Sequence, residues 1–420
     1  MKFLILVCCF FWSVRGDALA GNSWPQFRGP TGDGHSDSNG LPIQWSETNN
    51  VKWKTAIPGE GWSSPVIEGD QVWMQTATDE GKSLRLVSVN KNTGALIHNI
   101  EVFRIDAPEP KHAVNSHASP TPVVENGRVY LSYGMYGVAC VDSKTGKVVW
   151  ENHELKHDHD RNGPGSSPTL YQNLFILNCD GTELRYVAAL EKADGTLVWK
   201  KERSKSIDRA GEFKKAYSTP QIVRFGNQDQ LLSVGAFRVS SYRPATGEEI
   251  WSVDIPGFSN VPRPVASDGL AFICTGFTPA QLWAIRMDGK GDVTKTHVVW
   301  KYTKQVSLKP SILVIGDLLY MVSDNGVASC IRAKTGEPIW SERVGGEFSA
   351  SPIYAHGRIY LFSHQGATTV LQPGEKFQPL STNQLDGGFM ASPAIADNAL
   401  ILRTKTHLYR VEQAGSTPAL

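Results

Sequence analysis

The sequence predicts an all-β fold, an eight-bladed β-propeller of four-stranded antiparallel blades. A tripeptide of a small residue, a variable residue and proline recurs along the chain at steps of about 41 to 55 residues, the length of one blade. Most repeats also contain a polar turn with glycine, and a tryptophan follows that glycine four residues later. The high glycine and proline content is typical of a protein rich in strands and turns.

The tripeptide marks the start of each repeat and precedes β-branched or other apolar residues. Its copies are Ser63-Ser64-Pro65, Ala118-Ser119-Pro120, Ser166-Ser167-Pro168, Ser218-Thr219-Pro220, Pro262-Arg263-Pro264, Leu308-Lys309-Pro310, Ala350-Ser351-Pro352 and Ala391-Ser392-Pro393. Each copy is expected to lead into the innermost strand of a blade.

The glycine turn and the tryptophan mark the outer half of each repeat. The glycine suits a tight hairpin because it adopts the left-handed backbone conformation without strain. The tryptophan is expected to wedge between neighbouring blades. These tryptophans are Trp150, Trp199, Trp251, Trp340 and, less regularly, Trp300.

The two ends of the chain predict how the ring closes. The eighth repeat ends at Leu408–Val411 without a glycine turn or a tryptophan, whereas residues 50–54 form a strand with Trp53 and no blade before it. The N-terminal strand is therefore expected to complete the last blade, which leaves no open sheet edge. We expect a leader over residues 21–50, the propeller over 51–413 and a tail over 414–420.

Residues 1–20 have the features of an export signal. Lys2 precedes an apolar stretch, Phe3–Trp12, that is too short to span a bilayer, and the small residues Ala18–Ala20 follow. Cleavage near Ala20 would leave a soluble periplasmic or secreted protein without a membrane anchor. The leader is expected to pack on the propeller because Trp24 and Phe27 are costly to expose to water.

Charge and cysteine content narrow the possible functions. The chain has 42 Lys+Arg and 41 Asp+Glu, which argues against a nucleic-acid binder because such proteins need a basic surface. Cys140, Cys179, Cys274 and Cys330 each lie in an apolar, strand-like run, so they are expected to be buried free thiols. We expect a monomer.

Three long polar loops indicate the binding face. They connect the first four blades and span residues 104–116, 151–164 and 202–216. The middle loop contains His153, His157 and His159 with two aspartates, a set that could hold a metal. A solvated polar loop is the favoured interpretation, because ligand spacing alone is weak support for a metal site.

The candidate binding residues lie in these loops or beside the repeated tripeptide. Lys111, His112, His117, His157, His159 and Arg161 belong to the loops. Arg263 and Lys309 replace the usual Ser or Thr and would either bind a carboxylate or phosphate or pair with nearby acids. Trp62, Tyr217, Phe348 and Phe389 precede the tripeptide, where core packing is favoured over stacking in the channel.

The repeat, a small residue with Ser-Pro and then x-Thr-Gly-x-x-x-Trp, resembles that of the pyrroloquinoline-quinone-like propellers. These include bacterial quinoprotein dehydrogenases and the outer-membrane assembly lipoprotein BamB, and the resemblance covers about Val51 to Val411. The leader segment Trp24–Pro30 also resembles one in exported propellers of planctomycete-type bacteria.

The resemblance implies two functions. The first is a non-catalytic scaffold that binds a protein, peptide or glycan, with no cofactor. The alternative is a quinoprotein dehydrogenase, which implies pyrroloquinoline quinone, calcium held by Glu, Asn and Asp, an aspartate base and an adjacent cysteine pair. The chain's adjacent pair, Cys8 and Cys9, lies in the predicted signal. Asp180 and Asp324 are expected in turns and not as ligands.

Overall fold

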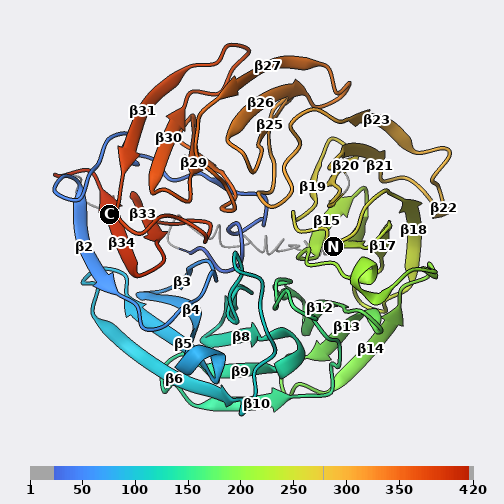
Figure 1. Cartoon of the computed structure of the whole chain (residues 1–420), viewed down its shortest axis with the longest axis horizontal. Coiled ribbons are helices and arrows are strands. Elements are labelled where there is room, and N and C mark those ends of the chain that lie inside the picture. The colour runs from blue at the N-terminus through green and yellow to red at the C-terminus, as the bar shows by residue number, and fades with distance from the viewer. Residues whose placement is uncertain (1–22, 278, 416–420) are drawn as a thin grey trace, which may run out of the picture.

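Eight sheets surround a central axis, and each is one blade of a propeller (Figure 1). The computed structural model describes residues 23–277 and 279–415. The predicted signal peptide, 1–20, and residues 416–420 of the predicted tail lie outside the described residues. The described part contains the predicted eight blades, each with four antiparallel strands, which confirms the fold class.

The strands of each blade are numbered from the axis outward. Blades 1 to 4 comprise β3 (Val66–Glu68), β4 (Gln71–Thr78), β5 (Ser83–Asn90) and β6 (Leu96–Arg104); β7 (Val123–Glu125), β8 (Arg128–Ser132), β9 (Val138–Asp142) and β10 (Val148–Asn152); β11 (Thr169–Tyr171), β12 (Leu174–Asp180), β13 (Arg185–Glu191) and β14 (Leu197–Glu202); and β15 (Gln221–Phe225), β16 (Gln228–Gly235), β17 (Arg238–Tyr242) and β18 (Glu249–Asp254).

The second half of the ring repeats this order. Blades 5 to 8 comprise β19 (Val265–Ser267), β20 (Leu270–Cys274), β21 (Leu282–Arg286) and β23 (Val298–Tyr302); β24 (Leu313–Ile315), β25 (Leu318–Val322), β26 (Val327–Arg332) and β27 (Pro338–Arg343); β28 (Ile353–Ala355), β29 (Arg358–Phe362), β30 (Ala367–Leu371) and β31 (Pro379–Gln384); and β32 (Ala394–Ala396), β33 (Ala399–Arg403), β34 (His407–Glu412) and β2 (Val51–Ala56). Three short 3-10 turns are η1 (Asp79–Gly81), η2 (Gly134–Tyr136) and η3 (Gly211–Lys214).

The N-terminal strand closes the ring. β2 pairs antiparallel with β34 as the outermost strand of blade 8, with Val51 opposite Val411 and Lys54 opposite Tyr409. Figure 1 shows this blue strand beside the red C-terminal strands. The predicted closure of the last blade is confirmed.

The hydrophobic core lies between the faces of neighbouring blades. In one interface, Cys140 of β9 packs in the same apolar cluster as Cys179 of β12. All four cysteines of the described chain, Cys140, Cys179, Cys274 and Cys330, are buried and free. The prediction of buried free thiols is therefore confirmed.

The glycine turn and the tryptophan of the repeat interlock between neighbouring blades. The indole Nε1 of Trp150 in blade 2 donates a hydrogen bond to the carbonyl of Lys192 in blade 3 (2.9 Å). Its ring covers Gly195, where an added Cβ would lie 2.6 Å from Cε3 of the tryptophan. Trp53, Trp199 and Trp300 cover the glycine of the following blade in the same way.

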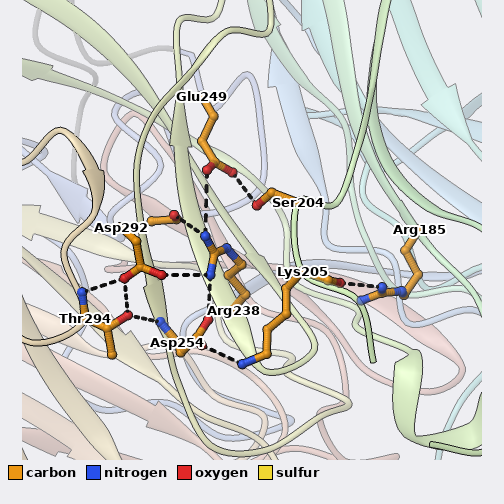
Figure 2. A network of polar contacts seen from close by, with 9 residues as sticks. Arg185, Ser204, Lys205, Arg238, Glu249, Asp254, Asp292 and Thr294 are labelled. Carbon is orange, nitrogen blue, oxygen red and sulfur yellow. Dashed lines mark hydrogen bonds and ion pairs between the residues drawn. The ribbon is translucent and has the colours of Figure 1, made fainter. Parts of the chain in front are cut away.

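Trp251 differs because a fifth strand covers its blade. The two-residue strand β22 (Gly291–Asp292) pairs in parallel with the outer strand β18, and Trp251 lies opposite Gly291. Arg238 fastens this edge, as Figure 2 shows, with its guanidinium between Asp254 (2.6 Å), Asp292 (3.5 Å) and Glu249 (3.9 Å).

The segment from Ser23 to Asn50, here called the leader, packs on the propeller. Trp24 is buried and forms a β-bridge with Ile67 of blade 1. The strand β1 (His35–Ser36) then pairs in parallel with β28 of blade 7. Between these points the leader passes through the middle of the ring, so it contacts inner strands on both sides of the axis.

Candidate functional site

A cavity of about 900 Å³ lies on the propeller axis. The loops between blades line it, including His112, Arg161 and Phe213 from the three long loops expected on the binding face. Shorter loops of the other blades and Phe27 of the leader complete the wall. The cavity is the candidate site because it collects side chains from blades around the whole ring.

A ring of hydroxyl groups surrounds the axis inside this cavity. Each ring residue lies just before an innermost strand, and its backbone N–H donates to the side-chain hydroxyl of the next blade. The seven bonds are Ser64 N to Thr121 Oγ1, Thr121 N to Ser167 Oγ, Ser167 N to Thr219 Oγ1, Arg263 N to Ser311 Oγ, Ser311 N to Ser351 Oγ, Ser351 N to Ser392 Oγ and Ser392 N to Ser64 Oγ. The distances range from 2.8 to 3.1 Å.

This ring corrects the register expected from the sequence in two blades. In blade 2 the hydroxyl comes from Thr121 and not from Ser119, and in blade 6 it comes from Ser311 and not from the position of Lys309. Both blades carry two extra residues ahead of the ring position, so the tripeptide proline there belongs to the preceding loop. Only in blade 5 does a charged residue, Arg263, occupy the ring.

The leader lies beneath the hydroxyl ring, on the side away from the long loops. It bonds to backbone groups that follow the ring residues in sequence: Val124 N donates to Pro25 O (2.8 Å), and Tyr354 N donates to Gly34 O (2.8 Å). Phe27, between these contacts, lines the cavity from below. The cavity is thus open toward the loops and narrowed at its base by the leader.

Aromatic side chains form much of the side wall. Trp62, Phe213, Tyr217 and Phe258 line the cavity, and Phe213 meets Phe258 edge to face at 5.0 Å. Asn162 holds the tyrosine in place by donating from Nδ2 to its hydroxyl (2.8 Å). Burial raises the pKa of Tyr217, so its hydroxyl stays protonated at neutral pH.

The charged groups on the wall are mostly paired with each other. Lys215 contacts Asp160 (3.0 Å), and this bond holds the pKa of Asp160 below its usual range. Lys309 contacts Asp324 (3.1 Å), which also accepts the backbone N–H of Leu308 (2.7 Å). Internal pairing leaves a wall that is largely apolar and nearly neutral.

The predicted site residues divide between the cavity and its surroundings. Trp62, His112, Arg161, Tyr217 and Lys309 line the cavity. Lys111 pairs with Glu60 (2.9 Å), and the ring nitrogen Nε2 of His117 lies 3.0 Å from the carbonyl of Glu109. Phe348 and Phe389 are 1% exposed and pack in two separate core clusters.

Two predicted histidines lie in a second, much smaller pocket beside Tyr217. His157 and His159 are buried, and their rings meet edge to face at 4.9 Å. His157 Nδ1 lies 2.8 Å from the carbonyl of Leu155. The favoured interpretation of this loop, a solvated polar segment, is wrong at these two residues because their side chains pack inward.

The guanidinium of Arg263 lies under the cavity, against the leader. It donates to the carbonyls of Phe27 (2.6 Å) and Pro220 (3.1 Å) and to the side chain of Gln26 (3.0 Å). Neither of the expected roles, an acid partner or direct exposure in the channel, matches these contacts. Its position depends on the path of the leader, which no repeat pattern indicates.

The residues present do not fit a calcium-bound quinone. In the described part of the chain, no three His, Cys, Asp or Glu side chains gather as metal ligands. Two of the carboxylates on the wall, Asp160 and Asp324, are already held by lysines. Calcium prefers several carboxylate and carbonyl oxygens, so this donor set suits it poorly.

The family model described as outer membrane protein assembly factor BamB matches residues 36–162, 85–223 and 235–376. The chain belongs to the BamB family. This match also confirms the resemblance of its repeat to pyrroloquinoline-quinone-like propellers.

Two curated relatives share parts of this BamB-family chain. BamB of Shewanella oneidensis is 23% identical over 241 residues, 53% of this chain and 56% of that protein. The quinoprotein alcohol dehydrogenase PedH of Pseudomonas putida is 29% identical over 140 residues, 31% of this chain and 22% of that enzyme. The chain thus matches only about half of one relative and a fifth of the other.

Solved structures share the fold of this BamB-family chain at low identity. The quinohemoprotein alcohol dehydrogenase of Comamonas testosteroni gives a TM-score of 0.70 at 11% identity, covering 97% of this chain and 83% of that one. BamB of Moraxella catarrhalis gives 0.58 at 12% identity, covering 86% and 99%. Such likeness shows the fold and leaves function to the site.

The hydroxyl ring and the aromatic residues Phe213 and Phe258 are the site residues that sequence reasoning missed. The Ser and Thr of each tripeptide were visible as a repeat signature, and their regular occurrence in most blades was the signal. Phe213 and Phe258 lie in irregular loops, where no periodicity marks them. No helix of the described residues has the length and apolar character needed to cross a membrane.

Proposed function

We propose that this chain is an exported, non-catalytic propeller that binds a protein or peptide segment in its axial cavity. The observation that carries this proposal is the cavity wall, where aromatic side chains are exposed and charged side chains are paired with each other. Such a wall binds apolar side chains and offers no free acid–base pair for catalysis. The printed name of the family, an assembly factor, agrees with a protein partner.

The export signal predicted over residues 1–20 supports a periplasmic or secreted location. We propose that the protein acts as a soluble monomer there, with the cavity open to a partner through the loop face. A glycan is the alternative ligand, since aromatic rings also stack on sugars.

The alternative function is a quinoprotein dehydrogenase, which the partial match to PedH favours. Calorimetric titration of the purified mature protein with pyrroloquinoline quinone, with and without calcium, separates the two. We expect no heat of binding from the folded protein. Calcium-dependent binding at micromolar concentration or tighter would overturn the scaffold function.

The binding function is tested with a displayed library of random peptides and a parallel glycan array. We expect the protein to select peptides rich in apolar residues. Trp62→Ala should weaken the best peptide by about tenfold or more, because aromatic residues in a pocket dominate such affinities. Tyr171→Ala, on the outer side of blade 3, is the matched control and should leave the affinity unchanged. Selection of glycans alone would contradict a polypeptide partner.

A further inference from the structure

The hydroxyl ring offers hydrogen-bond donors to the cavity. Six of its hydroxyl residues line the cavity and are at least nine-tenths buried: Ser64, Thr121, Ser167, Thr219, Ser351 and Ser392. Each oxygen accepts one backbone N–H from the preceding blade. A hydroxyl that accepts such a bond keeps its own proton, which it can donate to a ligand.

A further donor projects from the wall above the ring. Trp62 lines the cavity, and its indole Nε1 is buried without a hydrogen-bond partner among the described residues. An indole N–H can only donate. The ring and this indole therefore favour a ligand group made of acceptor oxygens.

Two buried guanidinium groups lie beneath the ring. Arg263 bonds to the leader carbonyl of Phe27, and Arg28 donates from Nη2 to the carbonyl of Ile312 (2.6 Å), next to ring residue Ser311. Among the described residues, no carboxylate lies within ion-pair distance of either group. Nε of both arginines and Nη1 of Arg28 also lack hydrogen-bond partners.

These two cations remain charged at neutral pH. Burial lowers the pKa of Arg28 to about 10 and that of Arg263 to about 9, and each side chain further lowers or fails to relieve the other's burden of positive charge. Buried charge without a counter-ion is unfavourable, and an anion placed above it restores the balance. The base of the cavity is thus electropositive.

We propose that the base of the cavity binds the C-terminal carboxylate of a partner polypeptide. This inference rests on the proposed peptide-binding function. The leader narrows the base, so a chain that enters from the loop face meets the hydroxyl ring with its end. A carboxylate accepts several hydrogen bonds there and is attracted by the arginines. An N-terminal ammonium would meet donors and positive charge instead.

The aromatic wall above the ring suits the residues that precede the terminus. Tyr217 and Phe258 lie on the wall of the same cavity as the ring. Apolar side chains near the end of the partner would pack against these rings while the carboxylate occupies the base. The expected ligand is therefore a polypeptide with an apolar C-terminal segment.

The test compares two forms of one peptide. A heptapeptide library with free C-termini is screened against the mature protein, and the tightest peptide is remade as the C-terminal amide. We expect the amide to bind at least about tenfold more weakly, because charge-assisted hydrogen bonds are lost. Equal affinity of acid and amide would overturn the inference and leave the peptide-binding function intact. If no peptide binds, both fail.

A substitution beneath the ring gives a second readout. Arg263→Gln removes the buried charge and keeps an amide donor for the leader. We expect the free acid to lose affinity and the amide to keep its own, so the ratio of the two dissociation constants falls toward one. A purely structural role would weaken both peptides equally and would overturn the assignment. Arg238→Gln, on the outer edge in Figure 2, is the matched control and should keep the wild-type ratio.

Competition distinguishes a chain terminus from a small free anion. Acetate and inorganic phosphate are each added to the preformed complex with the free-acid peptide. We expect neither to displace the peptide at equimolar concentration, because they lack contacts with the aromatic wall. Displacement by equimolar acetate or phosphate would assign the base to a free anion and overturn the proposed terminus.

Discussion

Arg203 and Asp180 form a buried ion pair that links blades 3 and 4. Two guanidinium nitrogens of Arg203 donate to the carboxylate of Asp180, Nε at 2.9 Å and Nη2 at 2.5 Å, and Nη1 donates to Ser233 of β16 (2.7 Å). The sequence suggested a turn position for this aspartate, but it ends β12 and points inward. The partner, Arg203, could not be predicted because it comes from the far end of the same blade.

Breaking this pair should destabilise the protein strongly. Asp180→Asn leaves the arginine charge buried without its counter-ion, and we expect the free energy of unfolding to fall by about 3–5 kcal/mol. Urea denaturation measures the change. The matched control, Glu248→Gln, removes the acid of the exposed pair Arg243–Glu248 (2.7 Å) and should change stability by less than about 1 kcal/mol.

The buried histidines should make stability depend on pH. Burial lowers the pKa of His157, and it lowers the pKa of His159 well below the usual value. Both stay neutral in the folded protein, whereas the unfolded chain takes up protons below about pH 6.5. The free energy of unfolding should therefore decrease as pH falls through this value.

Calorimetric melting between about pH 7.5 and pH 5.5 tests this dependence. His159→Gln should reduce the loss of melting temperature over this interval, because the variant lacks one group that protonates on unfolding. His112→Gln, in an exposed loop, should show the wild-type dependence. An unchanged pH dependence in His159→Gln would contradict the role of burial.

At the scale of elements, the contact between tryptophan and glycine holds neighbouring blades in register. The outer-strand tryptophan of one blade bonds to the turn of the next and lies against its glycine. The glycine needs its small side chain as well as its left-handed backbone, since φ at Gly195 is +76°. One short motif thus specifies both the hairpin and the interface.

Gly195→Ala should disturb both features. The new Cβ would clash with Trp150 and the left-handed backbone would be strained, so we expect a loss of about 2–3 kcal/mol in the free energy of unfolding. Gly226→Ala has φ +55° and no atom within 4 Å of the added Cβ, so it isolates the backbone effect. It should cost about 1 kcal/mol. Equal losses in the two variants would contradict the interface role.

The repeat pattern predicted the blades and their closure because each blade uses the same local chemistry. It failed where the spacing changes: two extra residues before Thr121 and Ser311 move the proline out of the strand register. Phe348 and Phe389 occupy the same sequence position as Trp62, yet they are buried and Trp62 reaches the cavity. Local pattern does not determine which way a loop side chain turns.

At the scale of the whole molecule, the N-terminal segment has two separable structural roles. Residues of β2 complete blade 8, and the leader before them narrows the base of the cavity. A chain starting at residue 46 loses most of the leader and keeps β2. A chain starting at residue 57 loses both.

These two truncations should behave differently. The chain from residue 46 should stay a folded monomer but lose affinity for the free-acid peptide, because Arg28 and Phe27 are gone. The chain from residue 57 should also expose the edge of β34, and we expect it to associate or aggregate. Size-exclusion chromatography and peptide titration measure both effects. A monomeric, fully stable chain from residue 57 would contradict the closing role of β2.

The leader also constrains the order in which the protein assembles. Arg28 bonds to Ile312, which lies 284 residues further along the chain, so a ribosome must release most of the propeller before this contact forms. Contacts between such distant residues form slowly. The first segment to be synthesised is thus among the last to reach its final place, and a nascent chain exposes Trp24 and Phe27 for most of its synthesis. Chaperones that recognise apolar segments would meet this protein first at its N-terminus.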